Sequence, residues 1–183
     1  IAPGSNDRCG DRAEAVLTPE HFHCECGGAW EFEPRHGFDP GLIEARDTSL
    51  WRYRRLLGLP FATPAVRLGA GWTPLLAHTV EGREIWVKPE YFAPTASFKD
   101  RGTAVMINVL AHQGVTHVTD DSSGNAGASV AAYAGRAGMR ADVFVPAYAS
   151  PAKQAQIGVY GARVHPIPGP RDNARQAALR AVE

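Results

Sequence analysis

The period of the hydrophobic pattern alternates along the second half of the chain. Short apolar runs typical of strands are followed by longer segments in which apolar residues recur every three or four positions, as in amphipathic helices. The expected strands cover residues 115–119, 141–145 and 163–167, and the expected helices cover residues 98–113, 128–137, 151–160 and 171 onward. Strands that alternate with helices in this way predict a parallel α/β sheet flanked by helices.

The helix expected over residues 98–113 has clear start and stop signals. Ser97 is a favourable N-cap residue, and Gly114 follows the last helical position. Val105, Ile107 and Leu110 are expected on the buried side of this helix. The elements expected further upstream are a short amphipathic helix over residues 49–57, a turn into a strand over 71–76 and a second strand over 84–88.

The segment SSGNAG at residues 122–127 connects an expected strand to the helix expected from residue 128. In a parallel sheet, loops at the carboxyl ends of the strands carry ligands, and the following helix offers unpaired N–H groups to an anion. Ser122 and Ser123 supply hydroxyl groups, and Asn125 supplies both a donor and an acceptor. The loop therefore predicts an anion site, with an ordinary strand-to-helix turn as the alternative. Neither G-x-G-x-x-G nor G-x-x-x-x-G-K-[ST] occurs, which disfavours a nicotinamide or nucleotide fold.

Lys99 lies in the segment PTASFKDRG at residues 94–102 and is one of three lysines in the chain, with Lys88 and Lys153. Its expected place in the first turn of a helix brings its charge to the positive end of the helix dipole, which favours the neutral amine. A neutral amine can attack an aldehyde, whereas a guanidinium cannot. We therefore expect Lys99 to be a nucleophile, with a solvated lysine of no specific role as the alternative. Lys88 and Lys153 are expected to be structural or to face the substrate.

Three cysteines near the start of the chain, an odd number, argue against a disulfide framework. Four soft zinc ligands can be assembled there from Cys9, His23, Cys24 and Cys26. The spacing departs from two Cys-x-x-Cys knuckles, because Asn6 occupies the partner position of Cys9. We therefore prefer a degenerate zinc-ribbon-like knuckle that binds no metal.

The composition disfavours several classes of partner. Of the 183 residues, 44% are hydrophobic and 21% are charged, and the formal net charge is zero. Because this globular composition contains no long basic run, neither nucleic acid nor a membrane surface is expected as a partner. No apolar stretch approaches the ~20 residues of a membrane span, and the first thirty residues are unlike a signal sequence. We expect a cytoplasmic protein that binds a small molecule.

Several segments together resemble the fold type II pyridoxal-phosphate enzymes, and among them the threonine synthases. The resemblance covers nearly the whole chain. The segments that carry it are the degenerate knuckles at Cys9 and at CECGG (24–28), SLWRYRRLL at 49–57, GWTPLL at 71–76, PTASFKDRG at 94–102, SSGNAGAS at 122–129 and VPAYASPAKQAQIGVYGARV at 145–164. The lysine and asparagine motifs are specific in this order and spacing. The resemblance implies a two-domain α/β architecture and pyridoxal 5′-phosphate as the cofactor.

The resemblance also implies roles for individual residues. Lys99 would form the internal aldimine with the cofactor and then move protons at the substrate carbons. Phe98 would lie beside the cofactor ring, and Asn125 would hydrogen-bond the ring hydroxyl. The loop residues that would hold the substrate carboxylate are Ser122, Ser123, Gly124, Asn125 and Ala126. Asp100 and Arg101 are expected to tie the helix to its surroundings rather than to perform chemistry.

The residues beside the lysine, Phe98 and Asp100, favour threonine synthase, which converts O-phosphohomoserine and water to threonine and phosphate. Asp120 and Asp121 argue against it, because they add negative charge where a phosphorylated substrate would approach, and Ala126 replaces a hydroxyl residue common in the family. A β-replacement or β-elimination enzyme of the cysteate synthase, threonine or serine dehydratase, or ammonia-lyase type is therefore left open. So is a non-catalytic α/β module that has lost the cofactor.

The resemblance divides the chain into three segments. Residues 1–48 carry the degenerate knuckles, residues 49–114 form part of a large domain with the lysine, and residues 115–183 form a small α/β domain. The family's glycine-rich phosphate loop and its polar partner of the pyridine nitrogen are not found in the sequence, so we expect an N-terminal portion of a longer protein. The expected partner is a small-molecule amino-acid substrate, and a homodimer is left open.

Overall fold

The computed structural model describes residues 4–5, 12–13, 24, 26, 31–32 and 37–182. The chain divides into two compact units, Ile1–Ala62 and Thr63–Glu183. Among the helices of the described residues, none has the length and apolar character needed to cross a membrane.

Short elements make up the described part of the first unit. Three two-residue strands pair antiparallel in the order β2-β1-β3, and they are β1 (Gly4–Ser5), β2 (Arg12–Ala13) and β3 (Glu31–Phe32). Two 3-10 helices follow, η1 (Pro40–Leu42) and η2 (Leu50–Tyr53). Trp51 is only 2% exposed and packs edge-on against Phe61, with the ring centroids 6.1 Å apart. Trp51 is therefore a buried anchor of this unit.

The prediction of an amphipathic helix over residues 49–57 is wrong in both the type and the length of the helix. Only Leu50–Tyr53 is helical, as a 3-10 turn whose start is capped by the Ser49 hydroxyl, which accepts a hydrogen bond from the Trp51 backbone N–H at 3.3 Å. Tyr53 and Leu57 are exposed. Because a segment this short needs tertiary packing to be a stable α-helix, the lack of a continuous buried stripe ends it after one turn.

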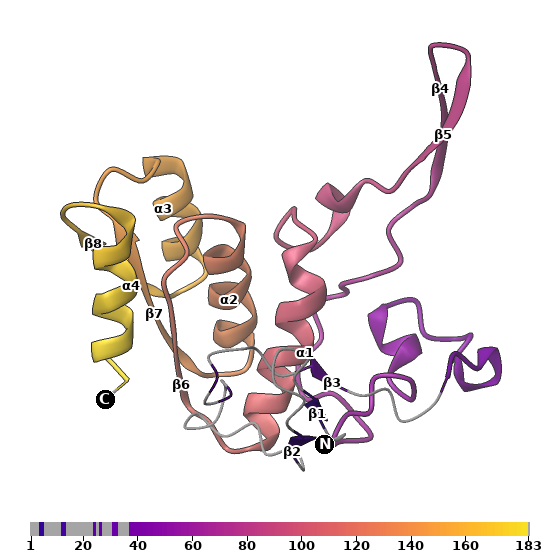
Figure 1. Cartoon of the computed structure of the whole chain (residues 1–183), viewed down its shortest axis with the longest axis horizontal. Helices are drawn as coiled ribbons and strands as arrows, with labels where there is room; N and C mark the ends of the chain where they lie inside the picture. Colours follow the sequence, from indigo (N-terminus) through magenta and orange to yellow (C-terminus); the bar gives the residue numbers. More distant parts are fainter. Residues whose placement is uncertain are drawn as a thin grey trace. The chain divides into compact units, whose positions relative to one another are not determined.

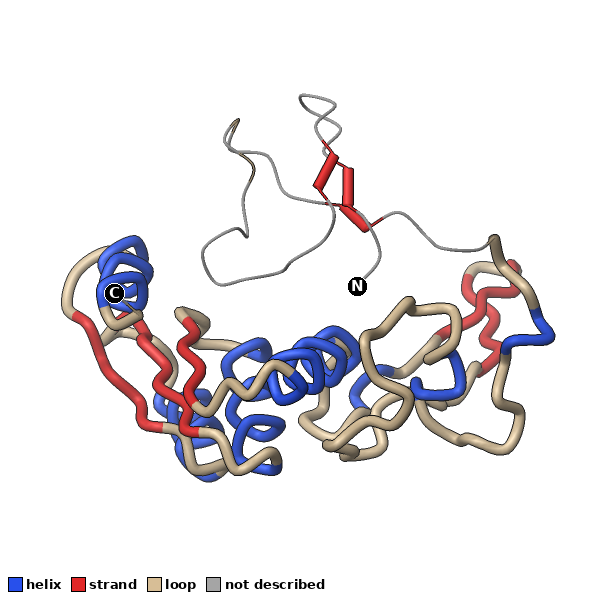
Figure 2. The backbone as a smooth tube through the Cα atoms, turned by 90° about the horizontal axis from the view of Figure 1, so that it is seen from below, coloured by secondary structure: helices blue, strands red, loops and turns tan. Residues whose placement is uncertain are grey.

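The second unit contains the predicted parallel sheet, and this prediction is confirmed. Strands β6, β7 and β8 are parallel neighbours in that order (Figure 1). The elements alternate as β6 (His117–Asp120), α2 (Asn125–Arg136), β7 (Arg140–Pro146), α3 (Pro151–Val159), β8 (Arg163–Ile167) and α4 (Arg171–Arg180). Helices α2 and α3 cover one face of the sheet and α4 covers the other (Figure 2).

Alternate residues of the central strand β7 build the core on the side of α2 and α3. Val143 and Val145 are fully buried there against Ala128 and Ala131 of α2 and Ile157 of α3. Alanines on α2 let this helix approach the sheet closely, because no long side chain stands between them. This packing holds α2 against the sheet, so that the helix begins next to the carboxyl end of β6.

On the other face of β7 a buried carboxylate joins the three strands. Asp142 is 3% exposed, and its two oxygens lie 2.6 Å from Nε2 of His117 on β6 and 2.6 Å from Nε2 of His165 on β8. Nε of Arg140 donates a third hydrogen bond at 2.7 Å. Burial alone would raise the pKa of Asp142, but the hydrogen bonds from Arg140, His165 and His117 outweigh it and leave the pKa well below its usual range. The carboxylate therefore holds the strand register.

Helix α1 (Lys99–His112) packs against α2 with a side that is partly polar. Ile107 is fully buried as expected, whereas the expectation for Val105 and Leu110 is wrong, because both are only half-buried. Asn108 is instead 2% exposed. Its amide accepts a hydrogen bond from Val66 N at 2.9 Å and donates to Val66 O at 2.9 Å, so this residue anchors the incoming chain to α1.

Replacing Asn108 with leucine is expected to lower the free energy of unfolding by roughly 2 to 3 kcal/mol, because it leaves the buried N–H and C=O of Val66 without partners. Urea unfolding monitored by circular dichroism measures this loss. Gln176, an exposed residue of α4, is a control position, where leucine should change stability by less than about 0.5 kcal/mol. Equal stability of the two variants would contradict the role of Asn108.

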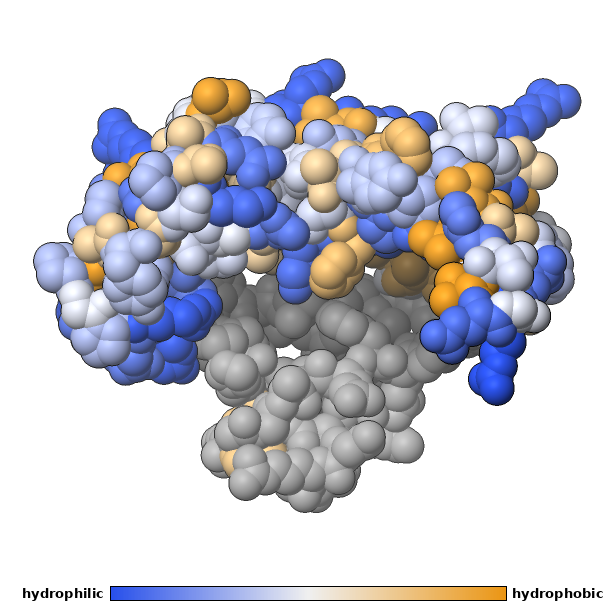
Figure 3. Space-filling view, turned by 90° about the horizontal axis from the view of Figure 1, so that it is seen from above, coloured by the Kyte–Doolittle hydropathy of each residue, from blue (hydrophilic) through white to orange (hydrophobic). Residues whose placement is uncertain are grey.

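The hairpin of β4 (Leu76–Val80) and β5 (Arg83–Val87) is exposed along its whole length. Glu81 and Gly82 connect the strands with φ values of 49° and 74°, the left-handed pair that matches the twist of a two-residue hairpin. Trp86 is 60% exposed, and further exposed hydrophobic side chains lie among hydrophilic ones on the face in Figure 3. Since a two-stranded hairpin is marginally stable alone in water, its apolar side chains are available for packing.

Candidate active site

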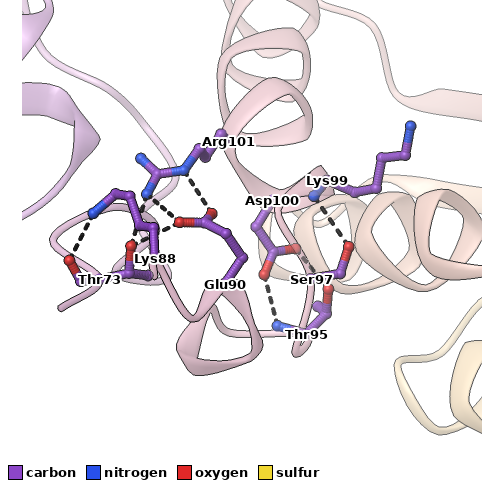
Figure 4. Close-up of polar contacts among 8 residues, drawn as sticks. All are labelled: Thr73, Lys88, Glu90, Thr95, Ser97, Lys99, Asp100 and Arg101. Atoms are coloured by element: carbon purple, nitrogen blue, oxygen red, sulfur yellow. Dashed lines mark hydrogen bonds and ion pairs between the residues drawn. The ribbon is translucent and has the colours of Figure 1, made fainter. Parts of the chain in front are cut away.

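Lys99 is the first residue of α1, one position later than expected for the start of this helix. Ser97 does not occupy the N-cap position, which is Phe98, but its hydroxyl accepts a hydrogen bond from the Lys99 backbone N–H at 3.1 Å. The side chain of Lys99 is exposed and points away from the neighbouring polar contacts (Figure 4). Its Nζ lies 4.9 Å from the centroid of the Phe98 ring, which is 58% exposed. The amine is therefore accessible beside an aromatic face.

Asp100 fixes the turn that carries Lys99. Its carboxylate is fully buried and accepts hydrogen bonds from Thr95 N at 2.7 Å, Thr95 Oγ1 at 2.6 Å and Ser129 Oγ at 2.6 Å. Ser129 belongs to α2, so the last of these bonds joins the first turn of α1 to the neighbouring helix. Asp100 thus ties the helix to its surroundings, as the sequence predicts. Ala96, inside the same turn, has a φ of 61°, a left-handed conformation that costs a non-glycine residue about 1–2 kcal/mol.

Arg101 holds the other side of the turn, which confirms the structural role expected for it. Its Nε and Nη2 donate to the two carboxylate oxygens of Glu90 at 2.7 and 2.8 Å, in the bidentate arrangement that suits a guanidinium. Thr73 Oγ1 donates to Glu90 Oε1 at 2.7 Å, and Lys88 Nζ donates to the backbone oxygen of Thr73 at 2.7 Å (Figure 4). Lys88 is thereby placed in this network.

The Glu90 network predicts a loss of stability in acid. The hydrogen bonds from Arg101, followed by that from Thr73, lower the pKa of Glu90 from 4.5 to about 2. Because the folded-state pKa is depressed, the stabilisation is present above about pH 4.5 and is lost as the pH falls toward 2. Between about pH 5 and about pH 3 the wild type should lose roughly 1 to 2 kcal/mol more than Glu90→Gln, measured by urea unfolding at both pH values. Equal losses in the two proteins would refute this assignment.

The loop between β6 and α2 is shorter than expected. Helix α2 begins at Asn125 rather than at residue 128, so Asn125, Ala126 and Gly127 form its first turn and only residues 121–124 connect it to the strand. Gly127 explains the early start: a Cβ on it would lie 2.1 Å from the backbone oxygen of Ser122. A side chain is therefore excluded where the loop folds back on the helix. Ser122, Ser123 and Gly124 precede the unpaired N–H groups of α2, as an anion site requires.

Replacing Gly127 with alanine is expected to displace the loop, since the added methyl group meets backbone rather than a flexible side chain. We expect roughly 1 to 2 kcal/mol less stability, and about tenfold weaker binding of pyridoxal phosphate, the cofactor that the resemblance implies, measured by thermal unfolding and fluorescence titration. Gly158 on α3 is the matched control, because a Cβ there meets nothing within 4 Å. Gly158→Ala should be stabilising by about 0.5–1 kcal/mol and leave binding unchanged. Wild-type binding by Gly127→Ala would contradict the steric role of this glycine.

The two candidate motifs lie at the starts of neighbouring helices. The hydrogen bond between Asp100 and Ser129 joins the residue next to Lys99 to a residue one turn after Asn125. Asn125 is exposed, and its Oδ1 accepts a hydrogen bond from Lys153 Nζ at 2.8 Å. The sequence predicts only that Lys153 is structural or faces the substrate. The small number of lysines in the chain, three, is the signal that could have drawn attention to it.

The acidic pair before the loop is partly buried and lies close to a cation. Burial raises the pKa of Asp120, and the adjacent charge of Asp121 raises it further. Asp121 lies 3.7 Å from Nη1 of Arg171, which offsets its charge. The positive charge of Arg171 therefore reduces the repulsion that this pair would exert on a phosphorylated substrate.

The candidate zinc ligands are only partly described by the structure. Cys24 is buried and Cys26 is half-buried, while Cys9 and His23 lie outside the described residues. Among the described residues, no group of three or more His, Cys, Asp or Glu side chains is arranged to hold a metal ion. The preference for a knuckle without metal stays a prediction.

Comparison with known proteins identifies relatives over most of the chain. Residues 66–183 match the family model described as "Pyridoxal-phosphate dependent enzyme". The threonine synthase of Methanocaldococcus jannaschii is 35% identical over 164 residues, which are 84% of this chain and 40% of that protein. The threonine synthase of Synechocystis sp. is 39% identical over 141 residues, 73% of this chain and 35% of that protein.

A solved structure supports the same relationship. The hydrogen sulfide-producing enzyme Fn1220 from Fusobacterium nucleatum superposes with a TM-score of 0.55 and 26% identity, over 61% of this chain and 40% of that one. The chain thus spans at most about 40% of the length of each of these three relatives.

Proposed function

Because this chain belongs to the pyridoxal-phosphate dependent enzyme family, we propose that it acts on an amino acid through a cofactor attached to Lys99. The predicted resemblance to fold type II enzymes, the α/β fold and the cofactor are confirmed by the family match and by the named relatives. The residue roles and the reaction are proposals. Bound pyridoxal phosphate supplies an electron-withdrawing ring that stabilises negative charge developing at a substrate carbon.

The residues at the two helix starts fit such a cofactor. The amine of Lys99 is exposed and primary, as attachment to an aldehyde requires, and the Phe98 ring beside it offers an apolar face. Asn125 carries an exposed amide at the start of α2, suited to a hydrogen bond with a ring hydroxyl. The amine thus suits the aldehyde of the cofactor, and the amide suits its ring hydroxyl. The N–H groups at the start of α2 suit an anionic group of the ligand.

The reaction that we propose is that of threonine synthase, the conversion of O-phosphohomoserine and water to threonine and phosphate. The observation that carries it is the identity of 35–39% with threonine synthases over 73–84% of the chain, which includes both motifs. In this reaction Lys99 Nζ would take and return protons at the substrate carbons. Ser122, Ser123, Gly124, Asn125 and Ala126 would bind the substrate carboxylate at the start of α2.

A β-elimination or β-replacement reaction is the second candidate. It is favoured by the likeness to Fn1220, which is named as a hydrogen sulfide-producing enzyme and is 26% identical. The same amine and the same carboxylate site would serve that reaction, because both reactions begin with proton removal from the amino acid. The substrate therefore distinguishes the two candidates better than the site does.

Substrate assays test the proposal. The purified protein with added pyridoxal phosphate should release phosphate from O-phosphohomoserine and form threonine, with little turnover of threonine, serine or O-phosphoserine. Turnover of O-phosphoserine or serine in place of O-phosphohomoserine would favour the second candidate. A cytoplasmic location, a homodimer and the division at residues 48 and 114 stay predictions.

A further inference from the structure

Lys153 reaches from one helix to the candidate cofactor residue on another. It is the third residue of α3 and is half-buried, and its Nζ donates a hydrogen bond to Asn125 Oδ1 at 2.8 Å. Asn125 is the first residue of α2. The contact is therefore made where the first turns of two neighbouring helices meet, beside the loop that precedes α2.

This contact determines which end of the Asn125 amide is available to a ligand. A lysine ammonium has three donors and no acceptor, so it can bind only the oxygen of an amide. If the amide were rotated by half a turn, its NH₂ group would face the ammonium, donor against donor. Lys153 thereby holds Oδ1 on its own side and leaves the two N–H donors of Asn125 for another partner.

The position is an unfavourable one for a lysine. In the first turn of α3 the ammonium lies near the positive end of the helix dipole, which disfavours a positive charge there. The contact is not needed to hold the helices together, since α2 and α3 are already packed through the buried side chains of Ala128, Ala131 and Ile157. A lysine kept there against the dipole therefore points to a role in orienting Asn125.

We propose that Lys153 is a positioning residue, which fixes the Asn125 amide so that its NH₂ group donates to the hydroxyl oxygen of the cofactor ring. This inference rests on the proposed function, in which Asn125 binds that hydroxyl. Lys153 itself acts through Asn125 and does not touch the ring. Its ammonium also adds positive charge on the side of the amide oxygen, which makes the N–H groups stronger donors.

The test uses two ligands that differ only in the ring hydroxyl. Pyridoxine 5′-phosphate has the hydroxyl but no aldehyde, so it binds without covalent attachment, and 3-deoxypyridoxine 5′-phosphate lacks the hydroxyl. Fluorescence titration gives the dissociation constant of each ligand for wild type, Lys153→Met, Lys153→Arg and Asn125→Ala. Arg175→Met is the control for the loss of one positive charge, because it removes an exposed guanidinium from α4, a helix that carries none of the proposed cofactor residues.

We expect Lys153→Met to bind pyridoxine 5′-phosphate about tenfold more weakly than wild type and the 3-deoxy ligand equally well. Lys153→Arg should restore most of the affinity, because it too can donate to Oδ1. In the double variant Lys153→Met/Asn125→Ala the loss should not exceed that of Asn125→Ala alone, since both changes remove one interaction. Arg175→Met should bind both ligands as wild type does.

The outcomes separate this inference from the function on which it rests. Equal weakening for both ligands in Lys153→Met would overturn the positioning role, because it would indicate general attraction to phosphate. Wild-type affinity in Lys153→Met together with weak binding by Asn125→Ala would overturn it as well, while leaving the role of Asn125 intact. Wild-type affinity in Asn125→Ala would refute the proposed contact between Asn125 and the cofactor itself.

Discussion

Replacing Lys99 with alanine is expected to abolish covalent attachment of pyridoxal phosphate and to lower turnover by roughly a thousandfold or more. The amine is the only group of this side chain that can react with an aldehyde, and alanine removes it. The fold should tolerate the change, because the side chain is exposed and the hydrogen bond from residue 99 to Ser97 is made by the backbone. Thermal unfolding should therefore occur close to the wild-type temperature.

Borohydride reduction followed by mass spectrometry of peptides measures this attachment directly. Lys88→Met and Lys153→Met are matched controls, because with Lys99 they account for every lysine in the chain. Both should retain a reduced cofactor adduct on the peptide that contains residue 99. An adduct that persists in Lys99→Ala and is lost in either control would assign the attachment to another lysine and overturn the proposed site.

The regular part of the fold follows from local sequence patterns. Strand β8 matches its expected range of 163–167, and α3 ends one residue before its expected end, because Pro151 and Gly161 delimit them with strong backbone preferences. The alternation of strands and helices predicts a parallel sheet, since a crossover helix returns the chain to the end of the sheet at which the previous strand began. The hydrophobic pattern is therefore sufficient to predict the part of the fold in which strands alternate with helices.

Contacts between distant residues are what the local pattern could not supply. The early start of α2 depends on the close approach of Gly127 to Ser122. The sequence did not predict this start, because a segment that contains glycines is equally typical of a loop. The burial of Asn108 depends on its two bonds to Val66, 42 residues away. The contact between Lys153 and Asn125 spans 28 residues. The sequence could therefore nominate the reactive residues and a structural role for Asp100 and Arg101, but not the distant partners that these and other orienting residues contact.

Asp100 is the orienting residue with the largest expected effect on stability. Replacing it with alanine should lower the free energy of unfolding by about 3 to 5 kcal/mol, because three donors, Thr95 N, Thr95 Oγ1 and Ser129 Oγ, would be left in a buried site without their acceptor. Pyridoxal phosphate binding should weaken too, since the turn before Lys99 would lose its link to α2. Urea unfolding and fluorescence titration measure the two effects.

Two further variants separate the buried contacts from the charge. Asp172→Ala removes a carboxylate that is 68% exposed in the first turn of α4, and it should change stability by less than about 1 kcal/mol. Asp100→Asn keeps one acceptor oxygen but turns an NH₂ group toward one of the buried donors, so it should have an intermediate stability even if the alanine variant fails to fold. If Asp100→Asn were as stable as wild type and bound the cofactor equally well, the turn that presents Lys99 would not depend on the buried carboxylate.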